Sequence, residues 1–147
     1  MEHQKILEHI SLTNHFLLIL IRKGTGKALE ASVKNDYSHL LVNYDLDWTR
    51  LKQIGQHKSF TWNRPKHMEP TAAVDLITIR NKLHDQLKEC QDYLSRLKNG
   101  EGVLYKTTMT VNALGKIDVY HYILFLVQHA KRHLTQMEKI KSEFEKE

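Results

Sequence analysis

Cysteine is nearly absent from this chain, since Cys90 is the only one among 147 residues. No disulfide can form within the chain, which fits a reducing compartment, and we expect a cytoplasmic protein. Glycine and proline are also scarce, with six and two residues, and are concentrated between positions 24 and 70 and between 100 and 115. Because few helix breakers occur elsewhere, long helices are expected. The length suits a single domain, residues 1–147, with a sizeable core.

Long hydrophobic runs are missing as well. The longest early run, Phe16–Ile21, is far short of the roughly 20 residues that cross a bilayer, so no membrane partner is expected. The first residues, MEHQK, have neither the basic region nor the apolar segment of a signal peptide. The formal net charge of +5 raises the question of a polyanionic partner. The basic residues are dispersed among acids and form no arginine-rich arm, so the sequence predicts no nucleic-acid partner.

Hydrophobic periodicity predicts an all-α chain of three long or medium helices. The first covers residues 4–23 and ends at KGTGK, residues 23–27, where two glycines stop a helix at little cost. KGTGK does not match a phosphate-binding loop, because the GxxxxGK spacing is absent and the segment follows a helix. The second long helix is expected to start at Thr71, its cap, and to run to Lys98. The third starts near Asp118, a carboxylate that favours a helix N-terminus.

The remaining segments are shorter or irregular. Residues 28–33 could form one helical turn. Residues 37–54 could form a second, shorter helix, a piece of which Asp45 or Asp47 could cap. Residues 59–70 contain both prolines and are predicted to be irregular, with His67 able to line a cleft. Residues 103–114 alternate briefly between apolar and polar side chains, which is typical of an extended loop or a short hairpin. Cys90 shares a heptad-like stripe with leucines, which predicts a small core residue.

Two histidines occupy the apolar stripe of the last helix. His129 and His133 are four residues apart, so one ring lies about 6 Å above the other on the same face. Two imidazoles so placed could share one transition-metal ion, or they could be a hydrogen-bonded interior pair. A third ligand would have to come from another helix, and His9 is the best candidate because it borders the apolar stripe of the first helix. Position 130 is alanine, so the HExxH pattern of zincin-type enzymes is excluded.

The other histidines and a tyrosine are weaker candidates. His15 is less well placed than His9 for a site. Tyr122 shares the stripe of His129, so its hydroxyl could face a cavity, although a core tyrosine is the simpler interpretation. The histidines expected to be exposed or ambiguous are His3, His39, His57, His84 and His121.

The two ends of the chain resemble a known family. FLVQHAKRHLTQM resembles the HxxxHxxQ(I/M) signature that ends the bundle of DinB-like proteins, and KILEHISLTNHFLL resembles the helix that carries their first metal ligand. The resemblance implies a four-helix bundle with a divalent transition metal, zinc or nickel, held by His9, His129 and His133. It also implies that Gln136 supports a ligand from the side, and that a small-molecule substrate such as a low-molecular-weight thiol is used. Members of the family are metal-dependent hydrolases and thiol-dependent transferases.

One departure from the family concerns the start of the bundle. DinB-like proteins usually have a further helix before the one with the first histidine, whereas this chain starts almost directly at Gln4. Three long helices would leave part of the core uncovered. Residues 37–54 could supply the missing wall, a second subunit could, or the chain could be a truncated version. We expect a homodimer, because it would bury the exposed stripe.

Three functions are therefore open at the level of sequence. The first is a metal-dependent enzyme that activates a thiol or water for transfer or hydrolysis. The second is a non-catalytic metal-binding or stress-response protein. The third is a structural bundle in which the histidines only form hydrogen bonds. The residues select no particular substrate.

Overall fold

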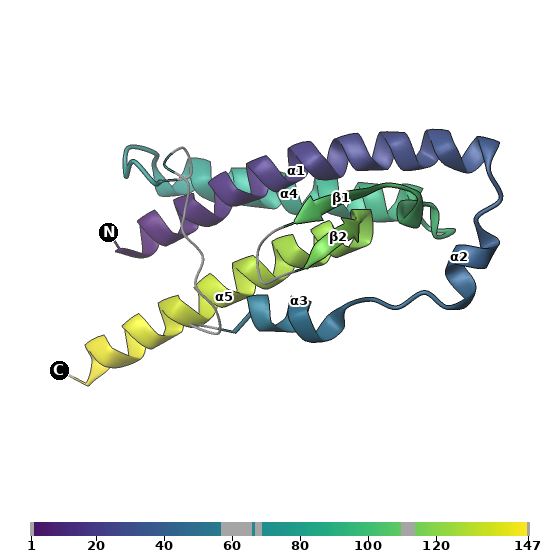
Figure 1. Cartoon of the computed structure of the whole chain (residues 1–147). Coiled ribbons are helices and arrows are strands. Elements are labelled where there is room, and N and C mark those ends of the chain that lie inside the picture. Colours follow the sequence, from purple (N-terminus) through teal and green to yellow (C-terminus); the bar gives the residue numbers. More distant parts are fainter. Residues whose placement is uncertain (1, 57–65, 67–68, 110–113, 147) are drawn as a thin grey trace.

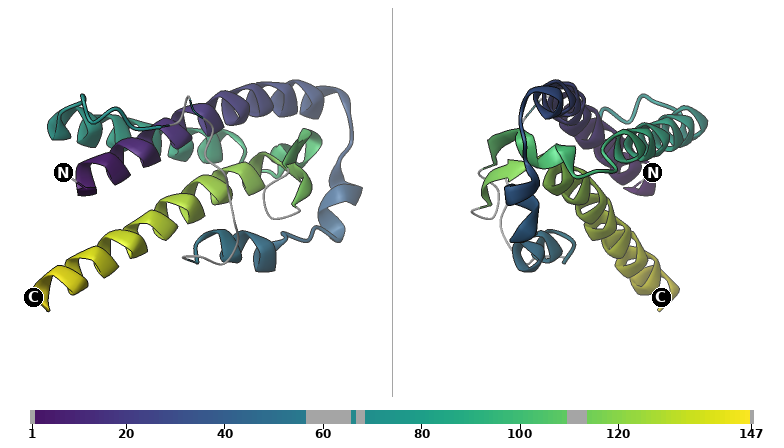
Figure 2. Two further views of the ribbon diagram at one scale, coloured as in Figure 1. Left: turned by 60° about the vertical axis from the view of Figure 1, so that its left-hand side comes forward. Right: turned by 90° about the vertical axis from the view of Figure 1, so that its right-hand side faces the viewer.

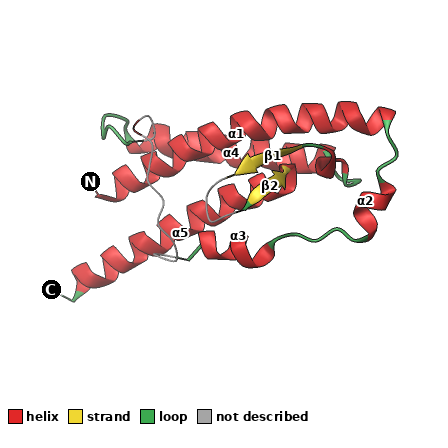
Figure 3. Ribbon diagram, in the orientation of Figure 1, coloured by secondary structure: helices red, strands yellow, loops and turns green. Residues whose placement is uncertain are grey.

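Helices make up most of the protein (Figure 3). The computed structural model describes residues 2–56, 66, 69–109 and 114–146. Three helices are long and two are short, and a small hairpin precedes the last helix (Figure 1). In chain order, the elements are α1 (Glu2–Lys34), α2 (Ser38–Val42), α3 (Trp48–Ile54), α4 (Leu76–Arg96), the 3₁₀ turn η2 (Glu101–Leu104), β1 (Lys106–Met109), β2 (Gly115–Asp118) and α5 (Val119–Glu145). None of the helices in the described ranges has a stretch long and apolar enough to cross a bilayer.

Helix α1 is the central element, because α4, α5 and η2 all pack on it. It runs parallel to α4, as Asn14 contacts Gln86 and Arg22 contacts Glu89 further along both helices. It runs antiparallel to α5, so both chain ends lie at the same end of the molecule (Figures 1 and 2). Seen end-on, α4 and α5 flank α1 on different sides (Figure 2). The faces of α1 therefore meet different partners.

Helix α3 supplies a short additional wall. It packs on α5, and its Leu51 and Ile54 are completely buried. The helix predicted over residues 37–54 is divided into α2 and α3 with residues 43–47 between them, and Asp47, one of the two predicted caps, begins the second piece. Asp47 causes the second start, since its carboxylate accepts a hydrogen bond from the Arg50 N–H. The all-α expectation holds for the long elements, and the homodimer stays a prediction.

The prediction that the first helix ends at residue 23 is wrong, because α1 continues through Gly24 and Gly26 to Lys34. A glycine inside a helix costs only about 1 kcal/mol relative to alanine, which packing can offset. Gly24 lies where α1 meets the start of α5. A Cβ atom there would be 2.9 Å from Val119 Cγ2 and 3.2 Å from Tyr105 Cδ1. The missing side chain at Gly24 therefore permits a close helix crossing.

Helix α4 begins later than predicted. Its N-cap is Asp75, whose carboxylate accepts a hydrogen bond from the Thr78 N–H at 2.9 Å, and not Thr71. Thr71 starts no helix because the next residue, Ala72, has a positive φ of 61°, and the N–H and hydroxyl of Thr71 donate to Glu8 on α1. Cys90 is buried, as predicted, and burial raises the pKa of its thiol to about 11, so it is an inert core residue.

A hairpin lies directly before α5. The sequence had predicted either an extended loop or a short hairpin over residues 103–114. Strands β1 and β2 pair antiparallel, with Lys106 opposite Asp118 and Met109 opposite Gly115. Asp118 caps α5 as predicted, because its carboxylate accepts a hydrogen bond from the His121 N–H at 3.0 Å. Most of the segment predicted to be irregular, residues 59–70, lies outside the described residues.

The two glycines of α1 give a matched test of the close crossing. A Cβ atom at Gly26 would meet open space, with no neighbouring side chain within 4 Å, so Gly26→Ala should raise the free energy of unfolding by about 0.5–1 kcal/mol through helix propensity. Gly24→Ala gains the same propensity but pushes against the buried Val119 side chain, so it should be less stable than Gly26→Ala and near or below the unmodified chain. Urea unfolding measures both variants. Equal stabilisation by the two substitutions would contradict the packing role of Gly24.

Candidate metal centre

Three histidine rings from opposite ends of the chain meet where α1 packs on α5. The ring centroids of His129 and His133 are 4.5 Å apart, and His9 lies 5.1 Å from the first and 4.7 Å from the second. Each ring offers one nitrogen, and these three atoms all lie within 4.8 Å of one another. His129 is fully buried and His9 is 6% exposed. The structure thus brings together the three residues predicted as ligands, in a position from which they could hold a metal ion.

Helix geometry explains the convergence. His129 and His133 are on successive turns of α5, on the face that packs against α1. His9 is on the third turn of α1, and the antiparallel packing sets that turn beside the middle of α5. Ile6 and Leu126, each one turn from a histidine, are buried and exclude water from the same interface.

Hydrogen bonding defines which nitrogen His133 can offer. Its Nδ1 lies 2.8 Å from Gln136 Oε1, and its Nε2 lies 3.1 Å from His129 Nε2. With the amide oxygen of Gln136 as acceptor, His133 carries its hydrogen on Nδ1 and keeps the lone pair of Nε2 for the centre of the cluster. Metal-ligating histidines commonly donate their second ring nitrogen in this way, so the contact agrees with the predicted supporting role of Gln136.

Burial controls the charge of the cluster. It lowers the pKa of His129 well below its usual value, and the neighbouring His133, His9 and Arg132 lower it further. His129 is therefore neutral near pH 7. A neutral imidazole is the form that binds transition metals.

The donor set fits a transition metal. Two nitrogens bound to one tetrahedral ion at about 2.0–2.1 Å would lie about 3.4 Å apart, close to the 3.1 Å between His129 and His133. The same separation also suits a nitrogen–nitrogen hydrogen bond between the two rings. Three imidazoles suit zinc, nickel, iron or copper, and a site with three protein ligands keeps positions open for a substrate. Among the described residues, no carboxylate or thiol joins the cluster.

No family model, curated protein or solved structure matches the chain. The DinB-like resemblance therefore stays a prediction from the sequence. His9, His129 and His133 and the groups that surround them are the features of the structure that bear on function.

Glu8 lies beside the cluster and fastens the chain after residue 70 to α1. Its Oε1 accepts hydrogen bonds from the N–H and hydroxyl of Thr71, and its Oε2 accepts one from the Ala72 N–H. Burial raises the pKa of Glu8, but these three hydrogen bonds outweigh that effect and lower it below its ordinary value. Both carboxylate oxygens are thus engaged in structure, so Glu8 is not a spare base for the adjacent His9.

Tyr122 and His67 were further candidates for a site or cleft. Tyr122 is buried, and its hydroxyl is hydrogen-bonded to the Thr107 hydroxyl on β1, so it behaves as a core tyrosine that fixes the hairpin. His67 lies outside the described residues, so its predicted place at a cleft has no test.

His121, which the sequence left as exposed or ambiguous, is buried in a polar cluster. Its Nδ1 lies 2.6 Å from Asp118 Oδ1, and its Nε2 accepts a hydrogen bond from the Asp47 N–H at 3.2 Å. The Tyr44 hydroxyl donates to Asp118 Oδ2 at 2.6 Å, and both burial and this bond raise the pKa of Tyr44. Both nitrogens of His121 are thus engaged in fastening residues 44–47 to the start of α5. The feature of the sequence that could have predicted this cluster is Asp118, which lies at a helix start three residues before His121.

The engagement of Glu8 predicts a pH-dependent stability. Since its pKa is lower in the folded chain, the carboxylate stabilises the fold above about pH 4.3, and this contribution is lost as the pH falls through the folded pKa. Glu8→Gln should lower the free energy of unfolding at pH 7 by about 1–3 kcal/mol, because the amide cannot accept all three hydrogen bonds. Its loss of stability between pH 5 and pH 3 should also be smaller than in the unmodified chain.

Urea unfolding across that pH range measures both effects. Glu30→Gln is the control, since Glu30 is exposed on the same helix. A loss of the same size in Glu30→Gln, or an unchanged pH dependence in Glu8→Gln, would show that the clamp to Thr71 and Ala72 adds no stability.

Proposed function

We propose that the chain is a metal-dependent enzyme whose divalent transition metal is held by His9, His129 and His133. The observation that carries this proposal is the approach of three ring nitrogens to within 4.8 Å inside the α1–α5 interface. Two of the rings are almost fully buried, so their nitrogens converge inside the helix interface and not on the surface. Zinc or nickel fits a donor set made only of nitrogen.

The residues of the chain prepare the site in three ways. Burial keeps His129 neutral, so its lone pair is available near pH 7. Gln136 fixes the orientation of the His133 ring through Nδ1. The packing of α1 on α5 excludes water from the side of the cluster that faces the core, and this strengthens electrostatic effects there.

A low-molecular-weight thiol is the substrate class we favour. When bound, the metal would supply a positive centre that lowers the pKa of a coordinated thiol or water. A free thiol has a pKa of about 8.5 and bulk water one of about 15.7, so the thiol needs far less help to ionise. The described residues bring no carboxylate into the cluster, and both oxygens of Glu8 accept structural hydrogen bonds. The lower pKa of a thiol therefore favours transfer of a thiol to an electrophile over hydrolysis.

Metal binding is the first test. Protein purified without an affinity tag should bind one equivalent of zinc or nickel, measured by elemental analysis and by calorimetric titration. His9→Ala, His129→Ala and His133→Ala should each lose stoichiometric binding. Gln136→Ala should keep the site but weaken affinity by about 10- to 100-fold, because the His133 ring loses its hydrogen-bond acceptor.

His15→Ala is the matched control, since His15 is exposed on the same helix as His9. It should bind metal as the unmodified chain does. A tag-free chain that takes up no metal even after reconstitution, or a His129→Ala variant with unchanged metal content, would leave only the structural bundle with hydrogen-bonded histidines.

Catalysis is the second test. The metal-loaded chain should accelerate the reaction of a low-molecular-weight thiol, from a panel that includes bacillithiol and mycothiol, with an activated alkyl or aryl halide. The consumption of thiol should require the metal, disappear in His129→Ala and persist in His15→Ala. Stoichiometric metal without turnover of any thiol would instead support the non-catalytic metal-binding or stress-response function.

A further inference from the structure

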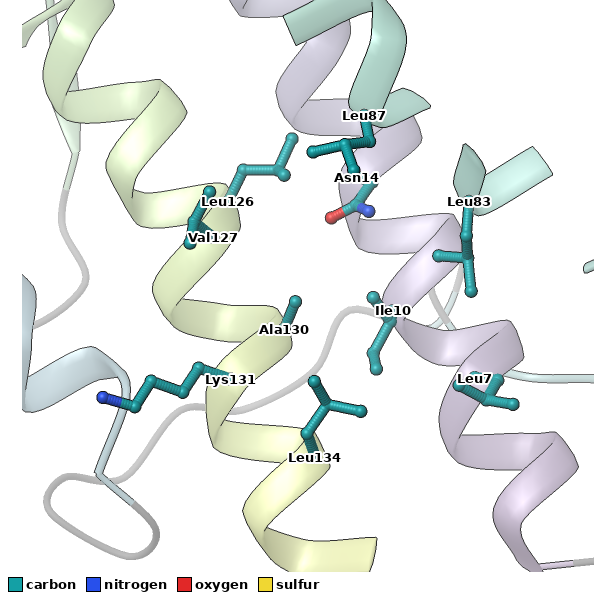
Figure 4. Close-up of a pocket in the computed structure, with 10 residues that line it drawn as sticks. All are labelled: Leu7, Ile10, Asn14, Leu83, Leu87, Leu126, Val127, Ala130, Lys131 and Leu134. Atoms are coloured by element: carbon teal, nitrogen blue, oxygen red, sulfur yellow. The ribbon is translucent and has the colours of Figure 1, made fainter. Parts of the chain in front are cut away.

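A cavity of about 320 Å³ lies between α1, α4 and α5 (Figure 4), and none of the three clustered histidines lines it. Ile10 and Ala130 line it, and each directly follows a histidine of the cluster, His9 or His129. Successive residues of a helix point about 100° apart, so the cavity and the histidines are on different faces of both helices. The walls of the cavity are mainly aliphatic, formed by side chains such as Leu7, Leu83, Leu126 and Leu134.

The polar residues in the wall are Asn14 and Lys131, and the ammonium group of Lys131 points away from the space between α1 and α5 (Figure 4). Asn14 is 5% exposed, and its Oδ1 is fully buried without a hydrogen-bond partner among the residues that the structure describes. In Figure 4 the Asn14 oxygen points into the space between α1 and α5, where Ile10 and Ala130 also point. A buried carbonyl without a donor is costly, and nearly all such groups in folded proteins are paired.

The direction of the Asn14 amide is set by its neighbours. Gln86 Nε2 donates to the backbone oxygen of Ser11 at 2.9 Å, and Gln86 Oε1 accepts from Asn14 Nδ2 at 3.1 Å. The backbone oxygen of Ser11 can only accept, so Gln86 must turn its nitrogen to Ser11 and its oxygen to Asn14. A reversed Asn14 would set two amide oxygens against each other. The network therefore leaves the Asn14 oxygen, and not its nitrogen, for the cavity.

We infer that this cavity binds a small aliphatic molecule that carries one hydrogen-bond donor, a hydroxyl or an amide N–H, which donates to Asn14 Oδ1. The aliphatic walls suit an alkyl body, and the single acceptor suits a single donor. The volume is within the range of about 300–1,000 Å³ that is typical of ligand pockets.

Two isomers of C₆H₁₄O provide the test with the full chain. 1-Hexanol can donate a hydrogen bond, whereas methyl pentyl ether has the same atoms and no donor. Titration followed by NMR should show 1-hexanol shifting the resonances of Ile10, Leu126 and Ala130. It should bind about tenfold more tightly than the ether, the size of effect expected for a hydrogen bond to a buried acceptor. The metal content of the chain should not change either affinity.

Substitutions separate the acceptor from the walls. Asn14→Leu should abolish the preference for 1-hexanol over the ether. Asn14→Leu also removes the hydrogen-bond partner of Gln86. Ala130→Phe therefore serves as a second variant, because it fills the cavity and leaves the network intact. This variant should bind neither 1-hexanol nor the ether. Leu87→Ala should weaken 1-hexanol binding, because Leu87 lines the cavity. Leu94→Ala is the matched control, as Leu94 is seven residues further along α4 and similarly exposed, at 43% against 50%, but does not line it.

Three results would overturn the inference. Neither isomer binds, or both bind the unmodified chain equally, or the resonances of the cavity shift with protein concentration and not with 1-hexanol. The last result would assign the cavity to a second copy of the chain. None of them bears on the metal site, which no lining residue of the cavity forms and which is tested by elemental analysis.

Discussion

The close crossing of α1 and α5 at Gly24 and Val119 is the constraint on which the rest of the structure depends. From that contact, fifteen residues back along α1 lead to His9, and ten and fourteen residues forward along α5 lead to His129 and His133. At about 1.5 Å per residue, these lengths cover similar distances along two antiparallel helices, so the three rings arrive at the same level. A bulkier side chain at Gly24 would separate the helices and, with them, the histidines.

The sequence alone predicted those parts of the structure that depend on the helical repeat within one segment. The stripe of α5, the cap at Asp118 and the burial of Cys90 follow from spacing alone, and helical register places His129 and His133 together. The pairing with His9 came from the family resemblance and from the apolar stripe of α1. The structure brings His9 to the other two rings, although it does not test whether a metal binds there.

What the sequence did not predict depends on contacts between distant residues. Gly24 has the local character of a helix stop, and only the approach of Val119, far along the chain, makes it a packing residue. The break between α2 and α3, and the burial of His121, require the hydrogen bonds that join Tyr44 to Asp118 and Asp47 to His121 across more than 70 residues. Thr71 is a residue type that often caps helices, but the left-handed backbone of Ala72 and the bonds to Glu8 hold this stretch outside a helix. The spacing of residues within one segment cannot predict these contacts.

The ligands that could form the metal site come from the first and the last long helix. Residue 9 leaves the ribosome long before residues 129 and 133, so the triad cannot exist until nearly all of the chain has been translated and α5 has docked on α1. An ion held by these rings would bind only the folded chain and would stabilise it by mass action. Metal occupancy would then report that α5 has been made and has docked on α1, and a product without α5 could not acquire the ion.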